Sequence, residues 1–215
     1  SDYFCEKNNI DINKNYKIEY IDAKTLLTSQ RIDLIAKIKY VEFKEKGYKL
    51  DFIKELYTSH IDAFSLGSFS EPGDNNKNSI DDYFNAFDQL IDDIKVKGLN
   101  DNISVVPVGK NNVILNGAHR TAIAIYFGLK VPIVRFDELH VSYGTEFFKN
   151  MLLPQKYLDY LVSEYCKIKD NIYVACVWPA AHGKERLQKT EDILRNNSKL
   201  IYKKNNSFFI GRGID

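Results

Sequence analysis

Apolar side chains recur at helical spacing along much of the chain. This spacing predicts helices over residues 26–46, 51–64, 79–97 and 185–196, and a mostly helical stretch over residues 138–166. Ser79 is a favourable N-cap residue, and Gly47 and Gly98 stand where helices commonly end. In the segment that follows Pro154, five side chains are expected to form one buried stripe: Tyr157, Leu158, Leu161, Val162 and Tyr165.

Shorter apolar or alternating runs predict strands over residues 16–21, 103–108, 171–178, 199–203 and 207–210. Residues 103–136 as a whole predict a strand, a turn, a second strand, a tight corner, a short helix and a final strand. We therefore expect an α+β fold with a mixed sheet. The expected parts are an N-terminal strand and helical cap (1–61), a core (62–137) and a C-terminal helical and α/β extension (138–215).

The charges of the chain almost balance. Lys and Arg total 30 and Asp and Glu total 29, so the net charge is +1. This balance argues against the broad positive surface of a DNA-binding protein, and no DNA partner is expected. No apolar run approaches the roughly 20 residues of a membrane-spanning helix, so no membrane span is expected either.

The three cysteines, Cys5, Cys166 and Cys176, form neither a disulfide framework nor a paired metal-binding spacing. Cys166 and Cys176 lie in apolar surroundings and are expected to be small buried residues. No pattern of a secretory signal is present, and a cytoplasmic location is expected. Because the chain begins at Ser1 and ends in Gly-Arg-Gly-Ile-Asp, we also consider it a piece of a larger, multidomain protein.

The corner at residues 116–120, Asn-Gly-Ala-His-Arg, is the strongest indication of chemistry. It joins a strand to a helix, where unpaired backbone N–H groups and the helix dipole favour an anion. Gly117 lets the backbone approach a ligand, and His119 and Arg120 add donors and positive charge. The pattern predicts a phosphate site. Alternatively, His119 and Arg120 only join the strand to the helix through surface hydrogen bonds.

Further candidates stand close to this corner or in the loop over residues 67–78. Thr121, in the first helical turn, offers a hydroxyl to phosphate or makes a local hydrogen bond. In the loop, Lys77 can neutralise a transferring phosphate and Asp74 can hold Mg²⁺ through a carboxylate oxygen. The alternative for both loop residues is a solvated surface.

Other polar residues are expected to have structural roles. His60, near the end of a predicted helix, is expected to be packed or capping. Arg31 and Lys37 are expected on a solvated helix face rather than over a nucleotide. His140 and His182 have no partners at metal-ligand spacing, so no zinc site is predicted.

The order of these features resembles the ParB/sulfiredoxin superfamily over residues 62–137. The similarity rests on two apolar residues followed by the Asn-Gly-x-His-Arg corner, on Gly128 and on the Val-Pro-Ile that begins at Val131. A helix that ends at Gly98 and leads into a strand also fits. The superfamily includes ParB partition proteins, sulfiredoxins and free serine kinases. The resemblance implies that residues 117–120 bind nucleotide phosphates.

Departures from the pattern favour one branch of the superfamily. Ala118 occupies the place of the sulfiredoxins' nucleophilic Cys, and no segment indicates the basic helix-turn-helix domain of ParB proteins. The free serine kinases are the branch with the most similar corner. They have Asp at the position of Asn116, which we therefore include in the predicted catalytic site. An amide cannot perform the acid–base work of a carboxylate. The resemblance also assigns Glu71 as the base that accepts the proton of a substrate hydroxyl; the alternative is a solvated loop acid.

These observations predict a kinase-like phosphotransferase. It would transfer a phosphoryl group from ATP, or another nucleoside triphosphate, to the hydroxyl of a small molecule with the help of Mg²⁺. One alternative is a non-catalytic nucleotide-binding or sensing module of a larger protein. Another is an accessory domain of a carbohydrate-assembly enzyme, whose fold serves partner binding.

Overall fold

The computed structural model of this chain describes residues 2–11, 13–70, 73, 77–99, 105–169, 174–177, 184–197, 200–204 and 207–211. The chain divides into two compact units, Ser1–Tyr157 and Leu158–Asp215. The three-part organisation expected from the sequence stays a prediction. Helices and two small sheets occur together, which confirms the predicted α+β class.

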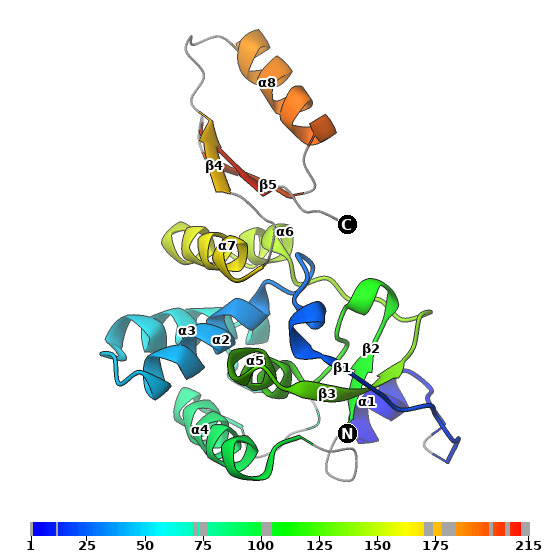
Figure 1. The fold of residues 1–215 in the computed structure, drawn as a ribbon. Coiled ribbons are helices and arrows are strands. Elements are labelled where there is room, and N and C mark those ends of the chain that lie inside the picture. Colours follow the sequence, from blue (N-terminus) through cyan, green and yellow to red (C-terminus); the bar gives the residue numbers. More distant parts are fainter. Residues whose placement is uncertain are drawn as a thin grey trace. The chain divides into compact units, whose positions relative to one another are not determined.

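The first unit contains a three-stranded mixed sheet in the order β1-β3-β2 (Figure 1). β1 (Glu19–Asp22) runs antiparallel to β3 (Lys130–Arg135), and β2 (Val106–Val108) runs parallel to β3. Parallel neighbours need a crossover connection, which α5 (Ala118–Phe127) provides. The register places Glu19 opposite Ile133 in the antiparallel pair and Val106 opposite Ile133 in the parallel pair.

Helices α2 (Asp33–Glu45), α3 (Asp51–Ser65) and α4 (Ile80–Lys97) surround α5 (Figure 1). α5 packs against α2 and α4, and α2 packs against α3. Because α2, α4 and α5 pack together in this way, most of the apolar core of the first unit lies among helices rather than between strands.

The predicted helices over residues 51–64 and 79–97 are confirmed. The N-terminus of α4 is held by a capping box: the Ser79 hydroxyl accepts from the N–H of Asp82, and the Asp82 carboxylate accepts from the N–H of Ser79. The predicted helix over residues 26–46 instead begins at Asp33. Asp22 caps a short 3-10 helix, η1 (Ala23–Leu26), and the chain turns before α2 starts.

The remaining elements of the first unit are short. They are α1 (Asp2–Lys7), the 3-10 helix η2 (Lys110–Asn112) and α6 (Thr145–Asn150). The stretch predicted as mostly helical over residues 138–166 is helical only in α6 and in α7 (Gln155–Ile168), which starts directly after Pro154. The predicted stripe of α7 is confirmed, since all five of its side chains are buried.

The second unit begins within α7 and contains an antiparallel sheet in the order β4-β6-β5. β6 (Ser207–Gly211) is central, between β4 (Val174–Val177) and β5 (Leu200–Lys204), and α8 (Lys184–Asn197) precedes β5. These elements confirm the predicted strand, helix and strand pair. In the described part of the chain, no helix is both long enough and apolar enough to cross a membrane.

Candidate functional site

The corner between β2 and α5 is built around Gly117. This residue precedes the first residue of α5 with φ of 84°, a left-handed conformation that glycine adopts without strain. A Cβ atom here would lie 3.0 Å from Nη2 of Arg120 and 3.4 Å from Cγ2 of Val106. The close approach of the Arg120 side chain to the backbone therefore favours glycine at this position.

Backbone N–H groups at the start of α5 are the main-chain donors of the corner. Thr121 is the first residue whose N–H reaches an intrahelical acceptor, the carbonyl of Gly117, over 3.0 Å. The N–H groups of Ala118, His119 and Arg120 precede it, and the N-cap residue Gly117 has no side chain to accept from them. Together with the helix dipole, these three groups form a positively polarised surface that suits an anion.

Two other side chains of the corner make local hydrogen bonds. Oδ1 of Asn116 accepts from the N–H of Gly117 over 2.6 Å. The hydroxyl of Thr121, which is buried, donates to the carbonyl of Gly117 over 3.0 Å. Both bonds hold the backbone where it enters α5. The catalytic role of Asn116 and the phosphate-binding role of Thr121 stay predictions.

Arg120 folds back from the first turn of α5 toward Gly117, and its side chain is partly buried. Burial lowers the pKa of its guanidinium, which nevertheless stays charged at neutral pH. Among the residues that the structure describes, none forms a hydrogen bond or an ion pair with this guanidinium. A half-buried charge without an anionic partner is costly, and a bound anion would remove that cost.

His119 lies between side chains from two other helices. Its Nε2 is 2.6 Å from the hydroxyl oxygen of Tyr57 on α3, and its ring packs T-shaped against Phe87 on α4 with centroids 4.6 Å apart. Burial, followed by the positive charges of Lys37 and Lys77, holds the pKa of His119 well below its usual range. The ring is therefore neutral at pH 7, so Arg120 rather than His119 supplies the positive side-chain charge within the corner.

The loop candidates are only partly described. Nζ of Lys77 lies 5.2 Å from the centre of the Tyr83 ring, and its charge acts on His119. Glu71 and Asp74 lie outside the described residues, so their predicted roles as base and Mg²⁺ ligand stay predictions. Elsewhere, across the described ranges, no three His, Cys, Asp or Glu side chains gather as metal ligands would.

Arg31, Asp33 and Lys37 form a buried ionic cluster, which is joined to the chain just before the corner at Ile114. We had expected Arg31 and Lys37 on a solvated helix face. Arg31 is 3% exposed, and its Nε and Nη2 donate to the two carboxylate oxygens of Asp33 over 2.7 and 2.8 Å. Its Nη1 donates to the carbonyl of Ile114, and its guanidinium lies 5.1 Å from the centre of the Tyr143 ring. The expectation of a solvated face was wrong because Asp33 provides a buried counter-charge.

Lys37 extends this cluster toward α3. It is also 3% exposed, and its Nζ lies 3.5 Å from Oδ2 of Asp33 and 3.4 Å from Nε2 of His60. Although burial raises the pKa of Asp33, the charges of Arg31 and Lys37 outweigh it and hold that pKa far below its usual range. Burial and the charge of Lys37 lower the pKa of His60, whose 0% exposure confirms that it is a packed residue.

One sequence signal could have revealed this cluster. The apolar residues among positions 33–41 cover more than one helix face. In the structure, every residue from Asp33 through Val41 is buried. A helix that is apolar on all sides is surrounded by protein, so the charges within it must be paired. The Asp33 and Lys37 spacing of four residues places two of those charges on one face.

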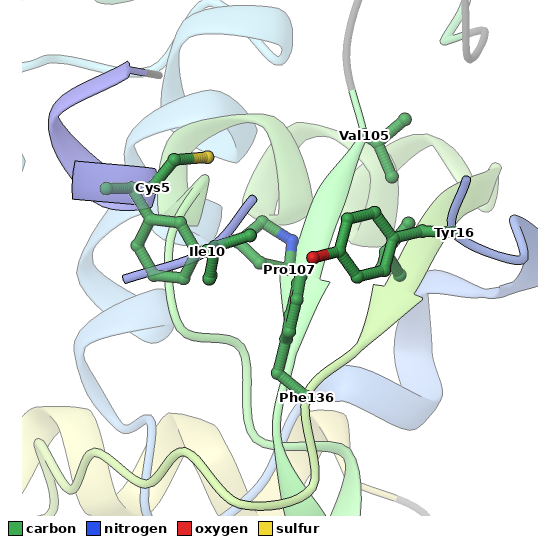
Figure 2. A pocket seen from close by; sticks show the side chains of 8 residues that line it. Cys5, Ile10, Tyr16, Val105, Pro107 and Phe136 are labelled. Carbon is green, nitrogen blue, oxygen red and sulfur yellow. The ribbon is translucent and has the colours of Figure 1, made fainter. Parts of the chain in front are cut away.

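An apolar cavity of about 220 Å³ lies on the face of the β1-β3-β2 sheet that is opposite to the corner (Figure 2). The Val106 side chain faces the corner, so its neighbour Pro107 points to the opposite face, where it lines the cavity with Tyr16 and Phe136. The remaining lining residues are Phe4, Cys5, Ile10, Val105 and Val134. The sheet thus separates this cavity from the corner at residues 116–120.

In comparisons with known proteins, no family model, no curated protein and no solved structure matches this chain.

Proposed function

We propose that the corner at residues 116–120, together with Thr121, binds the phosphate groups of a nucleotide. We also propose that the chain transfers a phosphoryl group from ATP or a similar nucleotide to a small-molecule hydroxyl. The observation that carries this proposal is Arg120. Its guanidinium is partly withdrawn from water and has no hydrogen bond or ion pair with another described residue. Its planar set of donors matches two oxygens of one phosphate group.

The surroundings of Arg120 support a phosphate rather than a neutral ligand. Three backbone N–H groups at the start of α5 lie beside the guanidinium. The positive charge of Lys77 also reaches the corner, because it lowers the pKa of His119. The resemblance to the ParB/sulfiredoxin superfamily, with free serine kinases as the nearest branch, suggests the nucleotide.

In this proposal the substrate oxygen attacks the terminal phosphorus while the bond to the leaving nucleotide oxygen breaks. Glu71 is proposed to take the proton of the hydroxyl, and Arg120 and the α5 backbone stabilise the charge on the phosphate oxygens. Mg²⁺, with Asp74 as its predicted ligand, would neutralise further phosphate charge when bound.

A second candidate function is nucleotide binding without transfer, as in a sensing module. Asn116 favours it, because this amide stands where the kinases have a carboxylate and its oxygen already accepts from the N–H of Gly117. An accessory domain of a carbohydrate-assembly enzyme would bind no nucleotide at all.

Calorimetry with ATP, ADP and CTP in the presence of Mg²⁺ tests the proposal. Arg120→Ala removes charge-assisted hydrogen bonds, each of about 1.5–3 kcal/mol, so we expect Kd to rise by about 10-fold to 150-fold. The control is Arg135→Ala, because Arg135 is exposed and already bonded to Glu19 and Asn112. Equal affinities of wild type and Arg120→Ala would contradict the site.

The second step separates the two candidate functions. Wild-type protein is incubated with the nucleotide that binds and with a panel of amino acids, sugars and small alcohols, and ³¹P NMR follows phosphorylated products. A new phosphate ester supports transfer. Tight binding without any product from the panel favours the sensing module, and no binding of any nucleotide favours the accessory domain.

A further inference from the structure

We infer that Tyr57 is a positioning residue for phosphate binding: its hydroxyl donates to Nε2 of His119, and so keeps the ring hydrogen of His119 on Nδ1 for a phosphate oxygen. This inference rests on the proposed function. It concerns a residue of α3 that lies 62 positions before His119 in the chain and that helical spacing assigns simply to the core.

The Tyr57 ring is fixed by its neighbours. Its side chain is 0% exposed, and its ring centre lies 5.5 Å from that of Tyr40, 5.3 Å from that of Phe84 and 5.7 Å from that of Phe87. With aromatic rings from α2 and α4 around it, the ring cannot swing away. The hydroxyl therefore stays at one place, 2.6 Å from Nε2 of His119.

The His119 ring is fixed as well. It stands in the first turn of α5, bonded to Tyr57 on one side and packed T-shaped against Phe87. Nδ1 has no hydrogen-bond partner within the described ranges, and the side chain is only partly buried. Nδ1 is thus the ring nitrogen available to a ligand at the α5 N-terminus.

Chemistry selects the direction of the Tyr57 hydrogen bond. A neutral imidazole has one donor and one acceptor nitrogen, and the bond made by one nitrogen sets the state of the other. Phosphate oxygens only accept, so an Nδ1 without hydrogen would direct its lone pair at them. When Tyr57 donates to Nε2, Nδ1 carries the hydrogen, and His119 contributes a donor without needing a second proton.

The experiment combines side-chain NMR with calorimetry on the full chain. Long-range ¹H–¹⁵N spectra of wild type should show His119 with hydrogen on Nδ1 and none on Nε2 at pH 7. Tyr57→Phe keeps the ring stack and removes the hydroxyl, so the hydrogen should shift toward Nε2. The affinity for the nucleotide that wild type binds should fall by about 3-fold to 10-fold, the effect of one lost net hydrogen bond.

Tyr40→Phe is the matched control. Tyr40 belongs to the same stack, but its hydroxyl donates to Asp88 over 3.0 Å rather than to His119. It should leave both the His119 spectrum and the affinity unchanged. In a His119→Ala background, Tyr57→Phe should have no further effect on affinity, a result that a merely structural role would not produce.

The outcomes are distinguishable. Hydrogen on Nε2 in wild type, or an unchanged spectrum in Tyr57→Phe, would overturn the inference while leaving nucleotide binding intact. A shifted spectrum with unchanged affinity would overturn the role toward phosphate. If wild type binds no nucleotide, the proposed function fails, and the role of Tyr57 in phosphate binding fails with it.

Discussion

Arg31 and Arg120 have opposite surroundings, although both lie close to the segment over residues 114–120. Arg31 is fully buried, and its guanidinium bonds to both carboxylate oxygens of Asp33 and to the carbonyl of Ile114. Arg120, six residues after Ile114, is partly buried, and within the described chain its guanidinium has neither a hydrogen bond nor an ion pair. The same side chain is thus paired with the protein in one place and unpaired in the other.

This difference separates an arginine that maintains the fold from one that suits a ligand. A guanidinium has five N–H donors and no acceptor, so it needs anions or carbonyls wherever water is excluded. For Arg31 the chain supplies them. Because Arg31 bonds to Ile114, just before the corner, it also fixes the backbone from which Arg120 extends toward the proposed phosphate.

Replacing Arg31 by Gln should have the largest effect on stability. Asp33 would remain buried with a weaker set of partners, and breaking a buried ion pair costs about 3–5 kcal/mol. We expect the free energy of unfolding, measured by urea denaturation at pH 7, to fall by about that amount. The pKa of the Asp33 carboxyl is far below its usual range in the folded protein. The stability that the ionised carboxylate contributes is therefore fully present above the pKa that Asp33 has in the unfolded chain, and it is lost as the pH falls toward the folded pKa. Denaturation at pH 7 thus measures this contribution in full.

Arg135→Gln is the control for this prediction. Arg135 is exposed, and its Nε lies 3.3 Å from Oε2 of Glu19, so its loss should change the free energy of unfolding by no more than about 1 kcal/mol. A similar small change in Arg31→Gln would mean that the buried cluster does not hold the corner in place.

Local patterns predicted much of the fold. The limits of α3 and α4 follow from strong helical periodicity and from the Ser79 cap, which are local properties of the sequence. The order of β2, α5 and β3 around Gly117 was predicted for the same reason. The second strand expected before the corner is absent from this described stretch, which η2 and an isolated bridge between Val108 and Ile114 occupy instead. The start of α2 was not, because residues 27–32 form a turn and a bridge before Asp33, although Leu27 and Ile32 among them are apolar and match helical spacing as well.

The surroundings of the site could not be predicted in the same way. The bond from Arg31 to Ile114 joins residues 83 positions apart, and that from Tyr57 to His119 joins residues 62 apart. A charged side chain within a helical pattern is normally assigned to the solvated face, and a tyrosine to the core. Only the packing of α2, α3 and α5 decides which of these groups meet.

Gly117→Ala should have a moderate effect on stability and a clear effect on binding. Gly117 and Gly128 flank α5, and both have positive φ, at 84° and 65°. An alanine in this conformation costs about 1–2 kcal/mol at either position. At Gly117 the new Cβ would also displace the Arg120 guanidinium, whereas nothing lies within 4 Å of a Cβ at Gly128.

Urea denaturation and nucleotide calorimetry on Gly117→Ala and Gly128→Ala sharpen the comparison. We expect similar losses of stability but a loss of nucleotide affinity only in Gly117→Ala. Equal affinities in the two variants would show that the position of the Arg120 guanidinium over the corner is not needed for binding.

Arg120→Gln should have the smallest effect on stability. Its guanidinium gives no bond to the described protein and bears the cost of partial burial, so removing the charge loses little and relieves that cost. We expect the free energy of unfolding in urea to change by no more than about 0.5 kcal/mol, in either direction. The same substitution at Arg31 should cost several times more. If Arg120→Gln is as destabilising as Arg31→Gln, then the Arg120 guanidinium stabilises the fold, and this result would contradict its proposed role as a phosphate-binding group.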